Sequence, residues 1–276
     1  MNEDLLQFTN DKSRFTYEND EIISADLSSL ELEILPLDAF DNCRTLKHLI
    51  LAYNKLSHLD SELLRPLENL ETLEIYFNQI ESLDEDIFHH MKHLKIIDMS
   101  NNQIKELPND LFMGLESLEE LDISDNKIRN IPDNLFRDLT SLVELTFTHN
   151  EFNTIKEKTF SNLKSIKNID LKNNQIESFE GQVFKGLPSL RRIDLDNNQI
   201  EHLEDNFLEG LDNLEILGLG WNKLKILPTL PENVKLKSLY MLGNPLPENQ
   251  AVNVRDEKRI REIFKELERK DKLLSE

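Results

Sequence analysis

Apolar side chains recur along this chain in a fixed order, with polar residues between them. From residue 46 onward the order is LxxLxLxxNxLxxL, and it returns every 24 residues. All five apolar positions of every copy hold Leu, Ile, Met or Phe, in the copies that start at residues 46, 70, 94, 118, 142, 166, 190 and 214. A fixed period of this length indicates a solenoid built from stacked units.

The alternating apolar residues inside each copy predict a short strand. Leu73 and Ile75 of one copy are separated by a single polar residue, as expected for a strand with one buried face. A single copy cannot bury its apolar face alone, so strands of successive copies must stack into a parallel sheet over a shared core.

Two further columns follow the same period. One is asparagine, directly after the predicted strand, at Asn54, Asn78, Asn102, Asn126, Asn150, Asn174, Asn198 and Asn222. An amide side chain both donates and accepts, so we expect it to satisfy backbone groups at the turn. The other column is Phe40, Phe88, Phe112, Phe136, Phe160 and Phe184. We expect it to fill the side of each coil opposite the sheet.

The period and the two columns resemble the leucine-rich repeat family over roughly residues 22–246. The resemblance implies an α/β solenoid, a horseshoe of about ten repeats with a parallel sheet on its concave face. Residues 1–21 are expected to form an N-terminal cap and 247–276 a C-terminal cap helix, all in a single structural domain. The apolar stripe of that helix is Ile260, Ile263, Phe264 and Leu267. An export signal or a partner-binding helix is the alternative for this segment.

The face of the strands that points away from the core is the candidate binding surface. Its central column reads Asp26, Ile50, Glu74, Asp98, Asp122, Thr146, Asp170, Asp194, Gly218 and Tyr240, and Asp196 lies beside it. Like charges at strand spacing destabilise a sheet unless solvent, basic neighbours or a partner relieves them. Aspartate is also common at this position throughout the family, so an ordinary structural role is the alternative.

Two apolar patches interrupt the acidic column. Ile50, Tyr53, Tyr76 and Phe77 are expected to project near the N-terminal end, and Ile216, Trp221, Tyr240 and Leu242 near the C-terminal end. Aromatic anchors among polar groups are typical of binding hot spots, although they also shield the turns of the coil. Gly218 and Gly220 predict a shallow, exposed depression beside Trp221 that suits a Lys or Arg side chain of a partner. The alternative is that the two small residues only relieve crowding beside Trp221.

Charge and composition narrow the choice of partner. The net charge is −21, which disfavours nucleic acid and anionic membrane, and a basic protein surface is expected instead. The start of the chain lacks the features of a secretory signal, no apolar run is long enough to span a bilayer, and Cys43 is the only cysteine. These features favour a cytoplasmic, acidic monomer.

Catalytic chemistry is not indicated by the sequence. His89, His90 and His93 lie close together in the chain, but no carboxylate or cysteine completes a metal-ligand set at a recognisable spacing. Cys43 occupies a column otherwise filled by Leu and Met, which predicts a buried apolar residue. We therefore expect no enzyme, no metal and no cofactor.

The expected function is a non-enzymatic scaffold that binds a protein or peptide on its concave face. One alternative is a bacterial effector delivered into a host cell through a C-terminal signal. Another is a regulatory subunit of an enzyme complex. The identity of the partner lies beyond the sequence, because outward residues vary freely while the fold persists.

Overall fold

The computed structural model describes residues 5–246 and 254–275, with helix side chains described as far as Glu266. The chain forms two compact units, Met1–Leu142 and Val143–Glu276, and each is described by itself. The first four residues of the predicted N-terminal cap, residues 247–253 and the side chain of Leu267 lie outside the described part.

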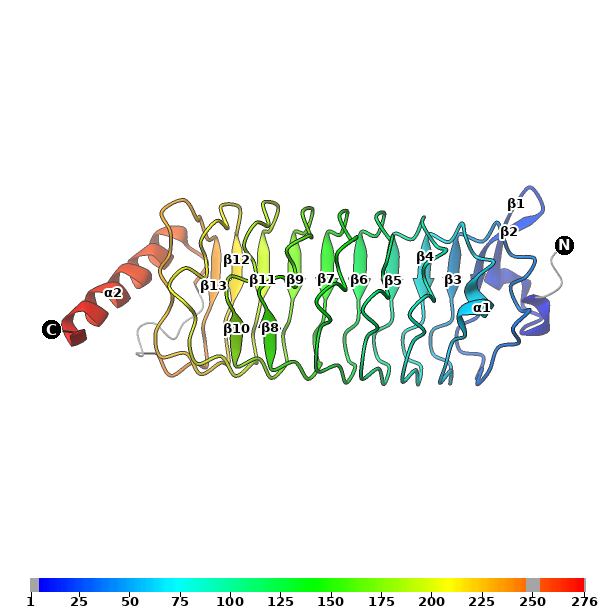
Figure 1. The fold of residues 1–276 in the computed structure, drawn as a ribbon, viewed down its shortest axis with the longest axis horizontal. Helices are drawn as coiled ribbons and strands as arrows, with labels where there is room; N and C mark the ends of the chain where they lie inside the picture. The colour runs from blue at the N-terminus through cyan, green and yellow to red at the C-terminus, as the bar shows by residue number, and fades with distance from the viewer. Residues whose placement is uncertain (1–4, 247–253, 276) are drawn as a thin grey trace. The chain divides into compact units, whose positions relative to one another are not determined.

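The first unit begins with an antiparallel hairpin and continues as a parallel sheet (Figure 1). Two short 3-10 helices, η1 (Leu5–Gln7) and η2 (Lys12–Arg14), precede the hairpin strands β1 (Phe15–Glu18) and β2 (Glu21–Asp26). The parallel strands that follow β2 are β3 (His48–Ile50), β4 (Thr72–Glu74), β5 (Ile96–Asp98) and β6 (Glu120–Asp122), with the one-turn helix α1 (Ser61–Leu64) between β3 and β4. Leu49, Leu73, Ile97 and Leu121 are register partners from strand to strand.

The second unit repeats this parallel arrangement. Its main sheet has the order β7 (Glu144–Thr146), β9 (Asn168–Asp170), β11 (Arg192–Asp194), β12 (Ile216–Gly218) and β13 (Ser238–Tyr240). A separate parallel pair joins β8 (Thr154–Lys156) to β10 (Ser178–Glu180). Figure 1 shows this pair on the other side of the coils from the main sheet. The predicted parallel-sheet solenoid is confirmed.

The asparagine column links each coil to the one before it. The amide nitrogen of Asn102 donates to the carbonyls of Met99 in its own coil and Ile75 in the previous coil, both at 3.1 Å. Its amide oxygen accepts from the N–H of Ile80, 3.0 Å away. The predicted role of the asparagines in satisfying turn backbone is therefore confirmed, and they also join neighbouring coils.

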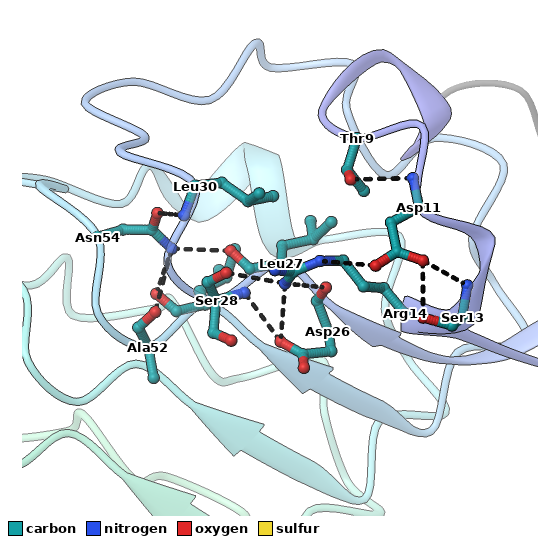
Figure 2. Close-up of polar contacts among 11 residues, drawn as sticks. Thr9, Asp11, Ser13, Arg14, Asp26, Leu27, Ser28, Leu30, Ala52 and Asn54 are labelled. Atoms are coloured by element: carbon teal, nitrogen blue, oxygen red, sulfur yellow. Dashed lines mark hydrogen bonds and ion pairs between the residues drawn. The ribbon is translucent and has the colours of Figure 1, made fainter.

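The first repeat has Leu30 where the other repeats have this asparagine. Asn54 of the next coil compensates, since its amide oxygen accepts from the N–H of Leu30 at 3.0 Å (Figure 2). The same oxygen accepts from the N–H of Leu32 at 3.1 Å. Its amide nitrogen donates to the Leu27 carbonyl at 2.9 Å. The backbone of the first coil is thus satisfied by a residue of the second.

The side of the coils opposite the sheet is filled by the phenylalanine column. The rings of Phe88 and Phe112 stack at 5.9 Å between centroids, and those of Phe160 and Phe184 stack at 5.7 Å. Cys43 is buried, as predicted.

The helix α2 (Glu257–Ser275) lies at the C-terminal end of the second unit and contacts β13. Ile260, Ile263 and Phe264 are buried, which agrees with the predicted stripe. Just before the helix, the backbone of Val254 exchanges two hydrogen bonds of 2.8 Å with Leu239 on the outer edge of β13. The last strand therefore has a backbone partner on both sides at this point. The division into two caps and one repeat domain stays a prediction.

Candidate partner-binding surface

The outward face is the side of each sheet that points away from the core, and its central column in the first unit is acidic. Register pairing places Glu74 beside Asp98 and Asp98 beside Asp122 on adjacent strands. Adjacent strands lie about 4.8 Å apart, so these carboxylates lie side by side. The sequence prediction of a stacked acidic column is thus correct for β4, β5 and β6.

The aspartates of this column have the structural role that the sequence analysis gave as the alternative, although it did not anticipate the hydrogen bonds involved. One carboxylate oxygen of Asp98 accepts from the N–H of Ser100 at 2.9 Å, and Asp122 accepts from Ser124 at 2.8 Å. A side chain that bonds the backbone two residues on makes an Asx turn, which ends the strand. The Asp-x-Ser spacing in these two repeats is the signal that would have revealed it.

On β4–β6 the charge of this column is not compensated by cations, whereas Asp26 at its start lies 3.6 Å from the guanidinium of Arg14. Within residues 5–246 and 254–266, no basic side chain comes within ion-pair distance of Glu74, Asp98 or Asp122. Burial raises the pKa of Glu74, and the charges of Asp98 and Asp26 raise it further. Burial also raises the pKa of Asp122, against the opposing hydrogen bonds from Ser124. The carboxylates of β4–β6 thus form a strongly negative strip.

The predicted aromatic patch of the first unit is a compact cluster of three rings. Tyr53 and Phe77 stack at 4.8 Å and 10° between ring planes, and Tyr76 meets both edge-on at 5.3 and 6.1 Å. Ile50 lies half-buried on the neighbouring strand β3. Tyr53 is 52% exposed and Phe77 46% exposed. We call Tyr53, Tyr76 and Phe77 the aromatic cluster.

Two members of the aromatic cluster have an unfavourable backbone conformation. Tyr53 and Phe77 have φ of 56° and 51°, in the left-handed region. The same column holds Asn101 and Asp125 in the next two repeats, and such residues adopt this conformation more readily. A bulky side chain there costs about 1–2 kcal/mol. This backbone conformation recurs every 24 residues from Tyr53 to Trp221, so backbone preference does not explain the aromatic residues at positions 53 and 77.

In the second unit the acidic column is paired internally. Arg192 lies 2.7 Å from the carboxylate of Asp194, which is only 3% exposed. Lys172 lies 3.1 Å from Asp170 and 3.6 Å from Asp194. Of the three sources of relief named in the sequence analysis, basic neighbours are the one present here, supplied by Lys172 and Arg192.

The expected depression at Gly218 and Gly220 is wrong in one respect, because both glycines are buried rather than exposed. A Cβ atom on Gly218 would lie 2.5 Å from Asp194 and 2.9 Å from Asp196. Asp196 also accepts from the N–H of Gly220 at 2.6 Å. The two carboxylates occupy the space that the missing side chains leave. This burial, together with the charge of Asp194, raises the pKa of Asp196 to about 6.

The second aromatic patch is more dispersed than the first. Trp221 is 59% exposed, has a φ of 53°, and its ring covers Gly243, where a Cβ atom would lie 2.6 Å from it. Tyr240 is half-buried, with the guanidinium of Arg255 at 5.8 Å from its ring centre. Ile216 is half-buried on β12. The chain itself thus supplies a cation to one aromatic ring of this patch.

Other candidate chemistry is sparse in the described residues. They contain no group of three or more His, Cys, Asp or Glu side chains placed to hold a metal ion. His89 contacts the carbonyl of Asp110 at 2.9 Å through its Nε2 atom. A cavity of about 390 Å³, which sequence reasoning missed, lies in the first unit and is lined by the β1–β2 hairpin and by residues that precede β3, β4, β5 and β6. Lys95 and Glu71 in its wall pair with each other at 2.6 Å.

Comparisons with known proteins bear on the family and the fold. The family described as "Leucine rich repeat" matches residues 26–80, 68–128, 117–176, 140–200, 165–224 and 188–246. None of the curated proteins matches this chain. Among the described residues, no helix has the length and apolar character needed to cross a membrane.

Three solved structures are similar to this chain. The TLR13–ssRNA13 complex matches with a TM-score of 0.68 and 31% identity over 73% of this chain and 30% of that chain. The Toll–Spatzle complex from Drosophila matches with a TM-score of 0.66 and 22% identity, over 79% of this chain and 34% of that chain. The leucine-rich repeat domain of APL1B matches with a TM-score of 0.53 and 21% identity, over 81% of this chain and 76% of that chain. The chain therefore spans about a third of the first two proteins.

Proposed function

The chain belongs to the leucine-rich repeat family, and on that premise we propose that it is a non-enzymatic scaffold that binds a protein or peptide on the outward face of its sheet. The observation that carries the proposal is the aromatic cluster of the first unit. Tyr53 and Phe77 are about half exposed, and their backbone has the left-handed conformation, which bulky residues rarely adopt. Exposed aromatic anchors of this kind dominate the energetics of protein interfaces.

The similar structures support recognition of a macromolecule, and charge selects its class. Toll appears in complex with Spatzle, and TLR13 in complex with a single-stranded RNA. A chain with a net charge of −21 repels phosphates, so a protein or peptide with a basic surface is the proposed partner here. In this proposal the scaffold is a cytoplasmic monomer.

The second unit contributes a secondary contact in this proposal. Trp221 and Leu242 are exposed apolar side chains. Ile216 and Tyr240, which lie a few residues before them in the chain, are half-buried. Asp194, Asp196, Gly218 and Gly220 act beneath this surface as a packed support, since they are buried or half-buried. No specific observation in the fold favours the two alternative functions, an effector delivered into a host cell or a regulatory subunit of an enzyme complex.

A selection from a random peptide display library on the full chain tests the proposal. We expect bound peptides to lose at least about ten-fold in affinity for the double variant Tyr53→Asn/Phe77→Asn, as removal of two anchors predicts. Asparagine suits the left-handed backbone at both positions, so the variant should fold.

The matched control is the double variant Ile34→Asn/Leu37→Asn. Both residues belong to the first unit, and they are 81% and 58% exposed, so this change removes exposed apolar surface outside the aromatic cluster. Peptides that bind the two double variants equally well would place recognition elsewhere and overturn the proposed surface.

A further inference from the structure

The two units treat the same columns of the outward face differently. In the second unit, Lys172 forms an ion pair with Asp170, and Arg192 forms one with Asp194. Arg255 in turn approaches the ring of Tyr240. Outward carboxylates and an outward aromatic ring of the second unit are thus each paired with a basic side chain of the chain itself.

The first unit has no such cations at the equivalent positions. The repeat register places Tyr76, Ser100 and Ser124 in the column of Lys172, and Thr72, Ile96 and Glu120 in the column of Arg192. Glu74 and Asp98 therefore have no basic neighbour within ion-pair distance in the described chain. Two adjacent carboxylates without a cation destabilise the sheet, and a cationic ligand would relieve that repulsion.

The aromatic cluster adjoins these carboxylates. Tyr76 follows Glu74 by two residues, so both side chains lie on the outward face. Burial raises the pKa of the Tyr76 hydroxyl, and the charges of Glu74 and Asp98 raise it further. Its neighbours in the same column are the small residues Ala52 and Ser100, both buried, so no bulky side chain flanks it there. Ring faces and carboxylates that lie together attract a cation by two mechanisms at once.

We propose that the aromatic cluster, Glu74 and Asp98 form an anchoring site for one arginine side chain of a peptide partner. The inference rests on the proposed function and names the chemistry of its main anchor. Arginine fits better than lysine, because a planar guanidinium stacks on a ring while its N–H groups reach a carboxylate. The site lies in the first unit, whereas the sequence alone placed a cation site at Gly218, where Asp194 and Asp196 fill the space.

Paired peptides test this site directly. Each probe is a synthetic peptide from the selection described above, made once with its arginine and once with citrulline, which has the same shape without the charge. We expect the full chain to bind the arginine form at least about ten-fold more tightly, as a desolvated cation–π contact with ion pairing predicts. Fluorescence anisotropy of labelled peptides gives both affinities.

Two charge variants locate the effect. Glu74→Gln/Asp98→Asn should remove most of the difference in affinity between the two peptides, because both charges are gone and only the cation–π contact remains. The new amide oxygen at position 98 can still accept from the N–H of Ser100. The control Glu85→Gln/Asp86→Asn removes the same charge from exposed positions in the same unit and should keep the ratio of the two affinities. Glu74→Gln alone serves if the double variant does not fold, and it should lower the ratio several-fold.

The possible results separate this inference from the proposed function. Peptides that need Tyr53 and Phe77 but bind equally well as arginine and citrulline forms would overturn the arginine site and leave the scaffold intact. A ratio that Glu74→Gln/Asp98→Asn does not change would also overturn the site. Binding that is indifferent to Tyr53→Asn/Phe77→Asn, or a selection that yields no binding peptide, would overturn both proposals.

Discussion

At the scale of single residues, buried polar side chains hold the coils together. Asn126 is buried, and its amide nitrogen donates to the carbonyls of Met99, Ile123 and Ser124 at 3.1–3.2 Å. Its oxygen accepts from Ile104 at 2.9 Å. One side chain thus satisfies four backbone groups in two coils, which an apolar residue cannot do.

Replacing Asn126 by Leu should lower the free energy of unfolding by about 3 kcal/mol, because backbone groups are left buried without partners. Urea denaturation measures the change. Asn130→Leu at an exposed position of the same repeat is the control and should change stability by less than about 0.5 kcal/mol. Equal stability of the two variants would contradict a structural role for the asparagine column.

Asp196 makes stability depend on pH. Its pKa rises from an ordinary 3.8 to about 6 on folding, because burial and the charge of Asp194 disfavour its ionised form. The folded state therefore binds the proton more tightly, so the destabilising effect is absent below about pH 4 and complete above about pH 6. Asp196→Asn should raise the melting temperature at pH 7.5 and leave it unchanged near pH 4.

Thermal melts of both proteins at the two pH values check this prediction. The amide that replaces the Asp196 carboxylate retains an oxygen able to accept from the N–H of Gly220, so this hydrogen bond survives the change. Asp205→Asn, at an exposed position of the same repeat, should have no effect at either pH. A melting temperature that falls at pH 7.5 in Asp196→Asn would show that the carboxylate stabilises the fold.

At the scale of elements, short strands gain stability only from their neighbours, and the ends of the sheets need special cover. The β1–β2 hairpin pairs with the first parallel strand, and its turn uses Asn19 and Asp20 at φ of 50° and 67°. Such residues suit the left-handed positions of a two-residue hairpin turn. At the last strand, Val254 and α2 supply the cover.

Ile263→Ala should lower the free energy of unfolding by about 2–4 kcal/mol, because a fully buried side chain of α2 is replaced by a cavity. Chemical denaturation followed by circular dichroism measures the loss. Lys258→Ala on the exposed face of the same helix is the matched control. If the two variants were equally stable, α2 would not contribute to the core of its unit.

At the scale of the whole molecule, net charge governs association. A chain with 53 acidic and 32 basic residues surrounds itself with a negative field. Such a field raises the rate at which a cationic partner arrives, and salt screens it over about 10 Å at 0.1 M. Affinity in the complex depends instead on contacts at the anchoring residues.

Association of an arginine-containing peptide with the full chain should therefore slow by about ten-fold between low salt and about 0.5 M salt. Stopped-flow measurements give the rate. A peptide of the same length with no net charge should show a much smaller change. If the association rate of the cationic peptide does not change with salt, the negative charge does not steer association and serves only solubility.

The sequence by itself determined the repeat, the sheet and the buried columns. Its apolar and asparagine positions return every 24 residues, and only one arrangement buries all of them at once. The pairing of Tyr53 with Phe77 also follows from the period, since residues 24 apart lie on adjacent coils. The repeat period alone therefore predicts that the rings of the aromatic cluster lie on adjacent coils.

Only the tertiary structure decided which outward positions are open. Gly218 and Gly220 read as a depression because they lack side chains, yet Asp194 and Asp196 of the preceding coil fill the space. Column positions also did not show that Arg255, from beyond the repeats, approaches Tyr240. The period fixes where each Cα atom lies, whereas the direction of a polar side chain depends on the charges and hydrogen-bond partners around it, and these change from coil to coil.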